Sequence, residues 1–205
     1  ILCLVSQERG TGKTTFLDLL RETFGNNAII VGNSEITSEF NALVSGKLIV
    51  GVDETSLEDN TKVTERLKMM STAKKVPMQR KGKDHEEIEN FTKYVLCSNN
   101  ETRFIYTQED EVRFWVRKID PIPEEDAIPD ILPILGEEIP GFLSFLLSRQ
   151  MHIREPQSRM WFSPADIETE ALIKLKQNQQ PKPVKAIKDR IHDLFLEFPA
   201  EEYLI

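Results

Sequence analysis

The chain has 205 residues, of which 40% are hydrophobic and 29% are charged, and its formal net charge is −8. This composition is typical of a globular domain, and we expect no apolar run long enough to cross a membrane. Taken alone, a net charge of −8 argues against a nucleic-acid-binding protein. The chain begins within an apolar run, without a Met, so we expect a piece of a longer protein.

Short apolar runs recur along the first part of the chain and predict β-strands, with helical patterns between the first of them. They lie at 1–5, 28–32, 47–54, 93–99 and 112–120. This alternation predicts an α/β fold with a parallel sheet flanked by helices. Prolines then cluster, and helical patterns follow at 137–149, 163–177 and 184–198. We therefore predict a core over 1–120 and a helical C-terminal appendage over 121–205.

The stretch SQERGTGKTT, residues 6–15, lies between the first predicted strand and an amphipathic helix. Glycines at 10 and 12 allow the backbone N–H groups to wrap a phosphate, and a helix N-terminus favours an anion. The pattern G-x-x-x-x-G-K-[ST] predicts that Lys13 reaches the β/γ-phosphates and that Thr14 binds Mg²⁺. Gln7 replaces the first glycine, and an ordinary glycine turn is the alternative. The predicted nucleotide-binding residues are Gly10, Thr11, Gly12, Lys13, Thr14 and Thr15.

Polar residues follow two later strands, at the sheet edge where ligands bind in open α/β folds. Asp53 is predicted to support the Mg²⁺ and Glu54 to accept a proton from an attacking water. Asn99 or Asn100, at the end of the strand predicted over 93–99, is predicted to position that water or to sense the γ-phosphate. The alternatives are two exposed acids and a simple Asn-Asn turn. Two cysteines, in the apolar runs at 1–5 and 93–99, are expected to be buried and reduced.

The segment 61–83 opposes the acidity of the chain, because it holds eight basic residues and one acidic residue, a net charge of +7. A local field of this kind attracts phosphate whatever the total charge. Gly82 suits a hairpin tip. The basic residues around it, which predict contacts with a nucleic-acid backbone without base preference, are Arg80, Lys81 and Lys83. A solvated charged loop is the alternative.

The order of these elements over residues 1–120 resembles the superfamily-3 helicases, AAA+-related hexameric DNA helicases of small DNA viruses, phages and mobile elements. GTGKTT, LIVGVDE and VLCSNN look like that family's A, B and C motifs, and VPMQRKGKD looks like its channel hairpin. The subtype looks like the helicase half of phage and prophage primase–helicases. The resemblance implies a P-loop NTPase of AAA+ type that uses ATP and Mg²⁺ and moves on single-stranded DNA.

The family also carries an arginine finger, supplied to the active site by the neighbouring subunit of the ring. Its position matches Arg113, with Arg117 as the alternative, and Asn99 is favoured over Asn100 as the C-motif residue. The expected assembly is a hexamer of the full-length protein, in the cytoplasm of a bacterial or phage-infected cell and without a membrane. Two other functions stay open: a DNA-independent AAA+ remodelling ATPase, and a nucleotide-gated assembly module that does not hydrolyse ATP.

Overall fold

The computed structural model describes residues 1–38, 43–58, 60–78, 86–150 and 162–179, and the single residues 187, 190, 191, 193 and 194. Its centre is a five-stranded sheet in the order β2-β3-β6-β1-β7, in which every neighbouring pair is parallel. The strands are β1 Leu2–Val5, β2 Ala28–Val31, β3 Ile49–Val52, β6 Lys93–Ser98 and β7 Trp115–Lys118. Each of the five predicted strands is present.

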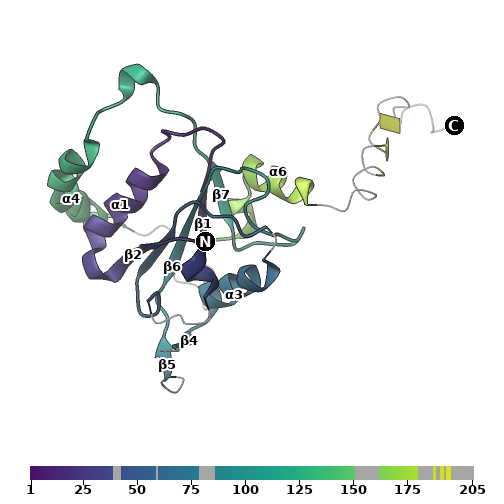
Figure 1. The fold of residues 1–205 in the computed structure, drawn as a ribbon, viewed down its shortest axis with the longest axis horizontal. Coiled ribbons are helices and arrows are strands. Elements are labelled where there is room, and N and C mark those ends of the chain that lie inside the picture. Colours follow the sequence, from purple (N-terminus) through teal and green to yellow (C-terminus); the bar gives the residue numbers. More distant parts are fainter. Residues whose placement is uncertain are drawn as a thin grey trace.

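Helices cover both faces of this sheet, as the sequence predicts, with α1 and α4 on one side and α3 and α6 on the other (Figure 1). Alternation along the strands explains the two apolar layers, because successive side chains of a strand point to opposite faces. In β1, Cys3 and Val5 join the core under α3 and α6, whereas Leu4 packs with Leu17 of α1. The helices are α1 Lys13–Phe24, α2 Asn33–Thr37, α3 Thr61–Thr72, α4 Ile131–Ser148, α5 Pro164–Ile167 and α6 Glu170–Asn178; short 3₁₀ turns span Gly25–Asn27 and Glu124–Asp126.

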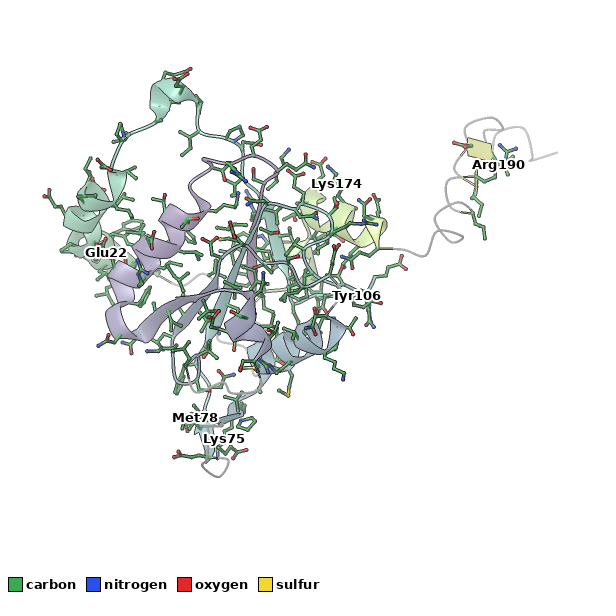
Figure 2. The ribbon with its side chains drawn as sticks, viewed as in Figure 1. Glu22, Lys75, Met78, Tyr106, Lys174 and Arg190 are labelled. Carbon is green, nitrogen blue, oxygen red and sulfur yellow. The ribbon has the colours of Figure 1, made fainter. Side chains whose placement is uncertain are left out.

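A second, two-stranded sheet stands apart from the first. Strands β4 Lys75–Met78 and β5 Glu86–Glu89 pair antiparallel and project away from the main sheet (Figure 1). Figure 2 shows Lys75 and Met78 on this projection. The structure thus has a hairpin where the sequence predicts one.

Part of the C-terminal region packs into the core. Leu172 and Leu175 of α6 are buried in the same cluster as Val116 of β7, and the Thr169 hydroxyl donates to the Val116 carbonyl. Ser163 begins α5 as its N-cap, with Pro164 as the first helical residue, at the start of the helical pattern predicted over 163–177. The boundary at residue 120 stays a prediction, and most of the helix expected at 184–198 lies outside the described residues.

Helix α4 packs along α1, close to Glu22 (Figure 2). Its 18 residues have a mean hydropathy of 1.4, so by length and composition alone the helix is long and apolar enough to cross a membrane. None of its residues is buried. The expectation that no apolar run reaches this length is therefore wrong for α4. Glu137, Glu138 and Pro140 interrupt the apolar sequence. One such helix is not, by itself, evidence of a membrane span.

Candidate functional site

A cavity of about 390 Å³ opens where β1, β3 and β6 end, at the carboxyl edge of the main sheet. Ligands bind at this edge in open α/β sheets. Because β6 lies between β1 and β3, the residues that follow these three strands meet here. The lining residues are Arg9, Gly10, Thr11, Gly12, Lys13, Thr14, Thr15, Asp53, Glu54, Cys97, Ser98 and Asn99.

The loop between β1 and α1 requires glycine at two positions. Gly10 and Gly12 have φ of +71° and +78°, values that residues with a side chain rarely adopt. Helix α1 starts directly after Gly12, and the N–H groups of its first turn have no acceptor within the helix. Gln7 does not have a positive φ, and its N–H donates to Glu101 Oε1 at 3.4 Å. The missing glycine therefore imposes no strain on the loop.

The Lys13 ammonium is nearly buried, with 9% of the residue exposed. It donates to Thr11 Oγ1 at 2.9 Å and to Glu8 O at 3.5 Å, so its hydrogen-bond partners in the described chain are neutral. A buried charge without an opposite charge is costly. The cavity therefore presents a positive group that an anionic ligand would neutralise.

The side chains of Thr14 and Asp53 contact each other in the cavity, where Thr14 Oγ1 donates to Asp53 Oδ2 at 3.1 Å. Hydroxyl and carboxylate oxygens suit Mg²⁺, which binds through one or two protein ligands, water and substrate phosphates rather than in an all-protein cage. No group of three His, Cys, Asp or Glu side chains converges among the described residues, so such a cage is not found there. The Thr14–Asp53 pair fits a Mg²⁺ that phosphate oxygens also hold.

Glu54 has an unusual backbone, with φ of +52°, a conformation that non-glycine residues rarely adopt. Its N–H donates to Asp53 Oδ1 at 3.0 Å. Asn33, the first residue of α2, donates from Nδ2 to Glu54 O at 2.8 Å and accepts at Oδ1 from the Ser56 N–H at 3.2 Å. Asn33 thus holds the chain on the C-terminal side of Glu54, at its carbonyl group and at Ser56. Sequence reasoning missed Asn33, although an Asn directly after a predicted strand is the same signal that selected Asn99.

The two asparagines after β6 have different surroundings. Asn100 Oδ1 accepts from the N–H groups of Thr102 and Arg103, at 3.0 and 2.9 Å, so that side chain stabilises the turn. Asn99 lines the cavity and is exposed. This placement favours Asn99, as the register of the sequence does.

Cys97 lies beneath the loop, with its thiol 3.8 Å from the Lys13 carbonyl oxygen. Burial, together with the charge of Asp53, raises the pKa of this thiol to about 12. Burial raises the pKa of Cys3 to about 12 as well, and both cysteines are free. The expectation of buried, reduced cysteines is confirmed.

Arg113 lies at the opposite edge of the sheet. Ile1 N donates to Arg113 O at 2.9 Å, and the chain from Ile1 to Ser6 spans roughly 16 Å at strand spacing, so Arg113 is remote from its own loop. Its guanidinium is 3.1 Å from Glu111 Oε1. Arg117 lies over the Trp115 ring, 5.8 Å from its centre.

The predicted DNA-contacting residues, Arg80, Lys81 and Lys83, lie outside the described residues; the strands that lead to them form the β4–β5 hairpin. The basic segment 61–83 does not act as one exposed field. Lys68 is buried in ion pairs, and Arg66 donates to the carbonyl oxygens of Ser38 and Ile36. Part of the predicted +7 therefore serves packing within the chain.

A larger cavity of about 560 Å³ lies elsewhere, among the side chains of Leu2, Leu20, Val95 and Trp115. Its lining is mainly apolar, although Ser71, Thr92, Lys93, Arg113 and Asp166 also contribute to it. We take the smaller cavity as the candidate site because it holds the loop, the acids and the amide together.

Fold and cavity together define a mixed α/β protein with a polar site at the carboxyl edge of a parallel sheet. Residues 4–117, more than half of the chain, match the model of a family of unknown function, DUF5906, and the chain belongs to that family.

A curated relative is the "DNA Primase-polymerase" of Nitratiruptor phage NrS-1, 26% identical over 201 residues. The match covers 93% of this chain and 27% of the relative, so the chain spans about a quarter of that protein. Two solved apo structures of the NrS-1 C-terminal region are similar in fold, with TM-scores of 0.74 and 0.72 at 22% identity. They match all of this chain, and the matches cover 50% and 49% of theirs.

Proposed function

We propose that the chain is the ATP-driven motor part of a phage or prophage replication protein, a DNA helicase of superfamily-3 type acting on single-stranded DNA. The observation that carries this proposal is the nearly buried Lys13 ammonium, which has only neutral hydrogen-bond partners in the described chain and lines a polar cavity. A triphosphate would supply the opposite charge. Similarity to a phage primase-polymerase supports a replication role, in the cytoplasm of a bacterial or phage-infected cell.

Nucleotide binding would use the backbone before the side chains. Gly10 and Gly12 let the chain approach the phosphates, and the N–H groups at the start of α1 donate to them. Lys13 adds a point charge at the β/γ-phosphates. Thr14 and Asp53 would hold Mg²⁺, which neutralises phosphate charge when bound. These contacts orient ATP with its γ-phosphate toward Glu54 and Asn99.

For hydrolysis, Glu54 would accept the proton of the attacking water, and Asn99 would orient that water or the γ-phosphate. Asn33 holds Glu54 in place through hydrogen bonds with the Glu54 carbonyl and the Ser56 N–H. Arg113 lies too far from its own loop to act there, which supports action on the site of an adjacent subunit. We therefore propose a homo-oligomeric ring, a hexamer in the full-length protein.

DNA binding is assigned to the hairpin formed by β4 and β5. Its projection from the body supports contact with a strand in the ring channel, through the backbone phosphates and Arg80, Lys81 and Lys83 (Figure 1). Because lysine–phosphate contacts carry no base information, binding should be independent of sequence.

The test is phosphate release by the full-length protein, with and without single-stranded DNA. We expect ATP turnover that DNA stimulates. The variant Lys81→Ala/Lys83→Ala should keep its basal turnover, lose DNA stimulation and flatten the log–log salt dependence of DNA binding by about 0.7 for each phosphate that is no longer neutralised. Lys62→Ala, on α3 in the same basic segment but off the hairpin, is the matched control and should behave as the parent.

Each competing function predicts a different result. Turnover that DNA leaves unchanged would favour the remodelling ATPase. Tight ATP binding without phosphate release would favour the assembly module. A parent protein that does not bind ATP would reject the nucleotide site itself.

A further inference from the structure

Three charged side chains meet at the amino edge of the sheet, far from the cavity. Glu111, in the loop before β7, lies 2.8 Å from Lys68 Nζ and 3.1 Å from Arg113 Nη1. The side chains of Glu111 and Lys68 are only 2% and 5% exposed, whereas that of Arg113 is 39% exposed. The cluster therefore connects a buried ion pair to a guanidinium that reaches the surface.

Both members of the buried pair are charged. Burial alone would raise the pKa of Glu111, but the hydrogen bond from Lys68, the N–H of Arg113 and the charges of both partners hold it below its ordinary value. Burial would lower the pKa of Lys68, and its hydrogen bonds to Glu111 and Glu65 outweigh this and raise it. Replacing a buried ion pair by uncharged groups is often neutral for stability, so stability alone does not account for the pair.

Glu111 also fixes the conformation of the backbone that follows it. Its Oε1 accepts from the N–H groups of Val112 and Arg113, at 3.0 and 2.8 Å. One carboxylate thus holds the backbone, the side chain of Arg113 and, through its second oxygen, the ammonium of Lys68. Glu111 therefore links Lys68 to Arg113.

Lys68 belongs to the helix that carries the hairpin. Helix α3 ends at Thr72, and β4 begins three residues later. Asn90, directly after β5, donates from Nδ2 to the carbonyl oxygens of Met70 and Ala73, and its N–H donates to Lys74 O at 2.9 Å. Asn90 therefore ties the base of the hairpin to the end of α3.

We propose that Glu111 is a positioning residue that couples the hairpin to Arg113. Through Lys68 it holds the unit of α3 and hairpin at a defined distance from Arg113, so a hairpin displaced by single-stranded DNA moves the guanidinium. This inference rests on the proposed function. In this proposal, the buried ion pair makes ATP hydrolysis in the adjacent subunit depend on DNA bound to the hairpin of this subunit.

The experiment compares the full-length parent with Lys68→Met/Glu111→Gln. This double variant removes both charges, while the amide oxygen of the introduced glutamine can still accept from the two N–H groups. The control is Asp18→Asn/Arg21→Met, which removes an exposed ion pair of 2.7 Å on α1. We measure thermal stability, ATP binding, and kcat and KM for ATP with and without single-stranded DNA.

We expect the double variant to fold and to bind ATP, with KM unchanged and kcat lowered. Its stimulation by DNA should fall by about fivefold or more, the lower end of ordinary coupling between two sites. The control should be stimulated as the parent is. A stable double variant with parental stimulation would overturn the coupling, whereas a parent that DNA does not stimulate would overturn the proposed function and the coupling with it.

A second measurement covers a double variant that does not fold. Hydrogen exchange of the Val112 and Arg113 amides is followed in the parent and in Glu111→Gln. In the parent, addition of single-stranded DNA should change this exchange, and in Glu111→Gln the response should be absent. Parental amides that do not respond to bound DNA would overturn the coupling.

Discussion

The two edges of the main sheet differ in how their polar groups are satisfied. At the carboxyl edge, Lys13 has neutral partners within the described chain and lines an open cavity. At the amino edge, Lys68 and Glu111 are fully paired with each other and with neighbouring groups. A charged side chain with neutral partners, such as Lys13, is suited to bind an external ligand. Charged side chains that pair with each other, such as Lys68 and Glu111, instead link two parts of the chain. In the proposed function, the carboxyl edge therefore serves binding and the amino edge serves coupling.

The largest effect should come from Lys13→Ala at the carboxyl edge. Removal of the ammonium should reduce ATP binding and bring phosphate release to background, because no other described cation is buried in the cavity lining. The melting temperature should not fall, since the change also removes a nearly buried charge whose hydrogen-bond partners in the described chain are neutral. If Lys13→Ala released phosphate at nearly the parental rate, the carboxyl edge would not be the ATP-binding edge of the sheet.

Arg113→Ala should have the next largest effect. The variant should still bind ATP, and its kcat should be lowered by about 10³-fold or more. Mixed with Lys13→Ala protein, it should regain part of its turnover, because one interface of a mixed ring then pairs an intact loop with an intact arginine. ATPase titration of one variant with the other measures this rescue. A verified mixed ring without rescue would make Arg113 structural or would point to Arg117.

Asn33→Ala should lower kcat by about 10–100-fold, part of what a general base contributes, because it frees the backbone around Glu54. Asn33→Asp is the matched variant, since it can still accept from Ser56 but can no longer donate to Glu54 O. We expect an intermediate kcat for Asn33→Asp and an unchanged KM for both. Equal and parental rates would show that Glu54 is held without Asn33.

The ion pair at the amino edge should also show in the acid dependence of stability. Because the folded pKa of Glu111 lies below its ordinary value of 4.5, its ionisation stabilises the protein above pH 4.5, and this contribution is lost as the pH falls through the folded pKa. The difference in melting temperature between the parent and Glu111→Gln should therefore be constant near neutral pH and shrink below pH 4.5. A melting-temperature difference that does not depend on pH would show that Glu111 and Lys68 do not form a charged pair.

Gln7→Gly should have the smallest effect. Position 7 does not need a positive φ, so glycine offers the loop no conformational advantage, and Kd for ATP should change by less than about tenfold. The added freedom of the unfolded chain should cost about 0.5–1 kcal/mol of stability. Isothermal titration and thermal unfolding check both values. A large gain in affinity would mean that the present loop is impaired.

Local patterns in the sequence determined much of the fold and of the carboxyl edge. Apolar runs predict each strand of the main sheet, and glycines at 10 and 12 predict the loop, because strand burial and left-handed backbone are local requirements. The site residues after β3 and β6 could be assembled from one rule, that parallel strands end at a common edge. Whether these residues bind ATP and Mg²⁺ stays a prediction.

Only the tertiary structure decided which distant side chains meet. Lys68 and Glu111 are 43 positions apart, and neither has a neighbouring pattern that indicates the other. Leu172 and Leu175 likewise join the core only because α6 packs on β7. Such contacts depend on how helices settle on the sheet, a property of packing over the whole chain, whereas strands and tight loops are specified by the few residues that form them.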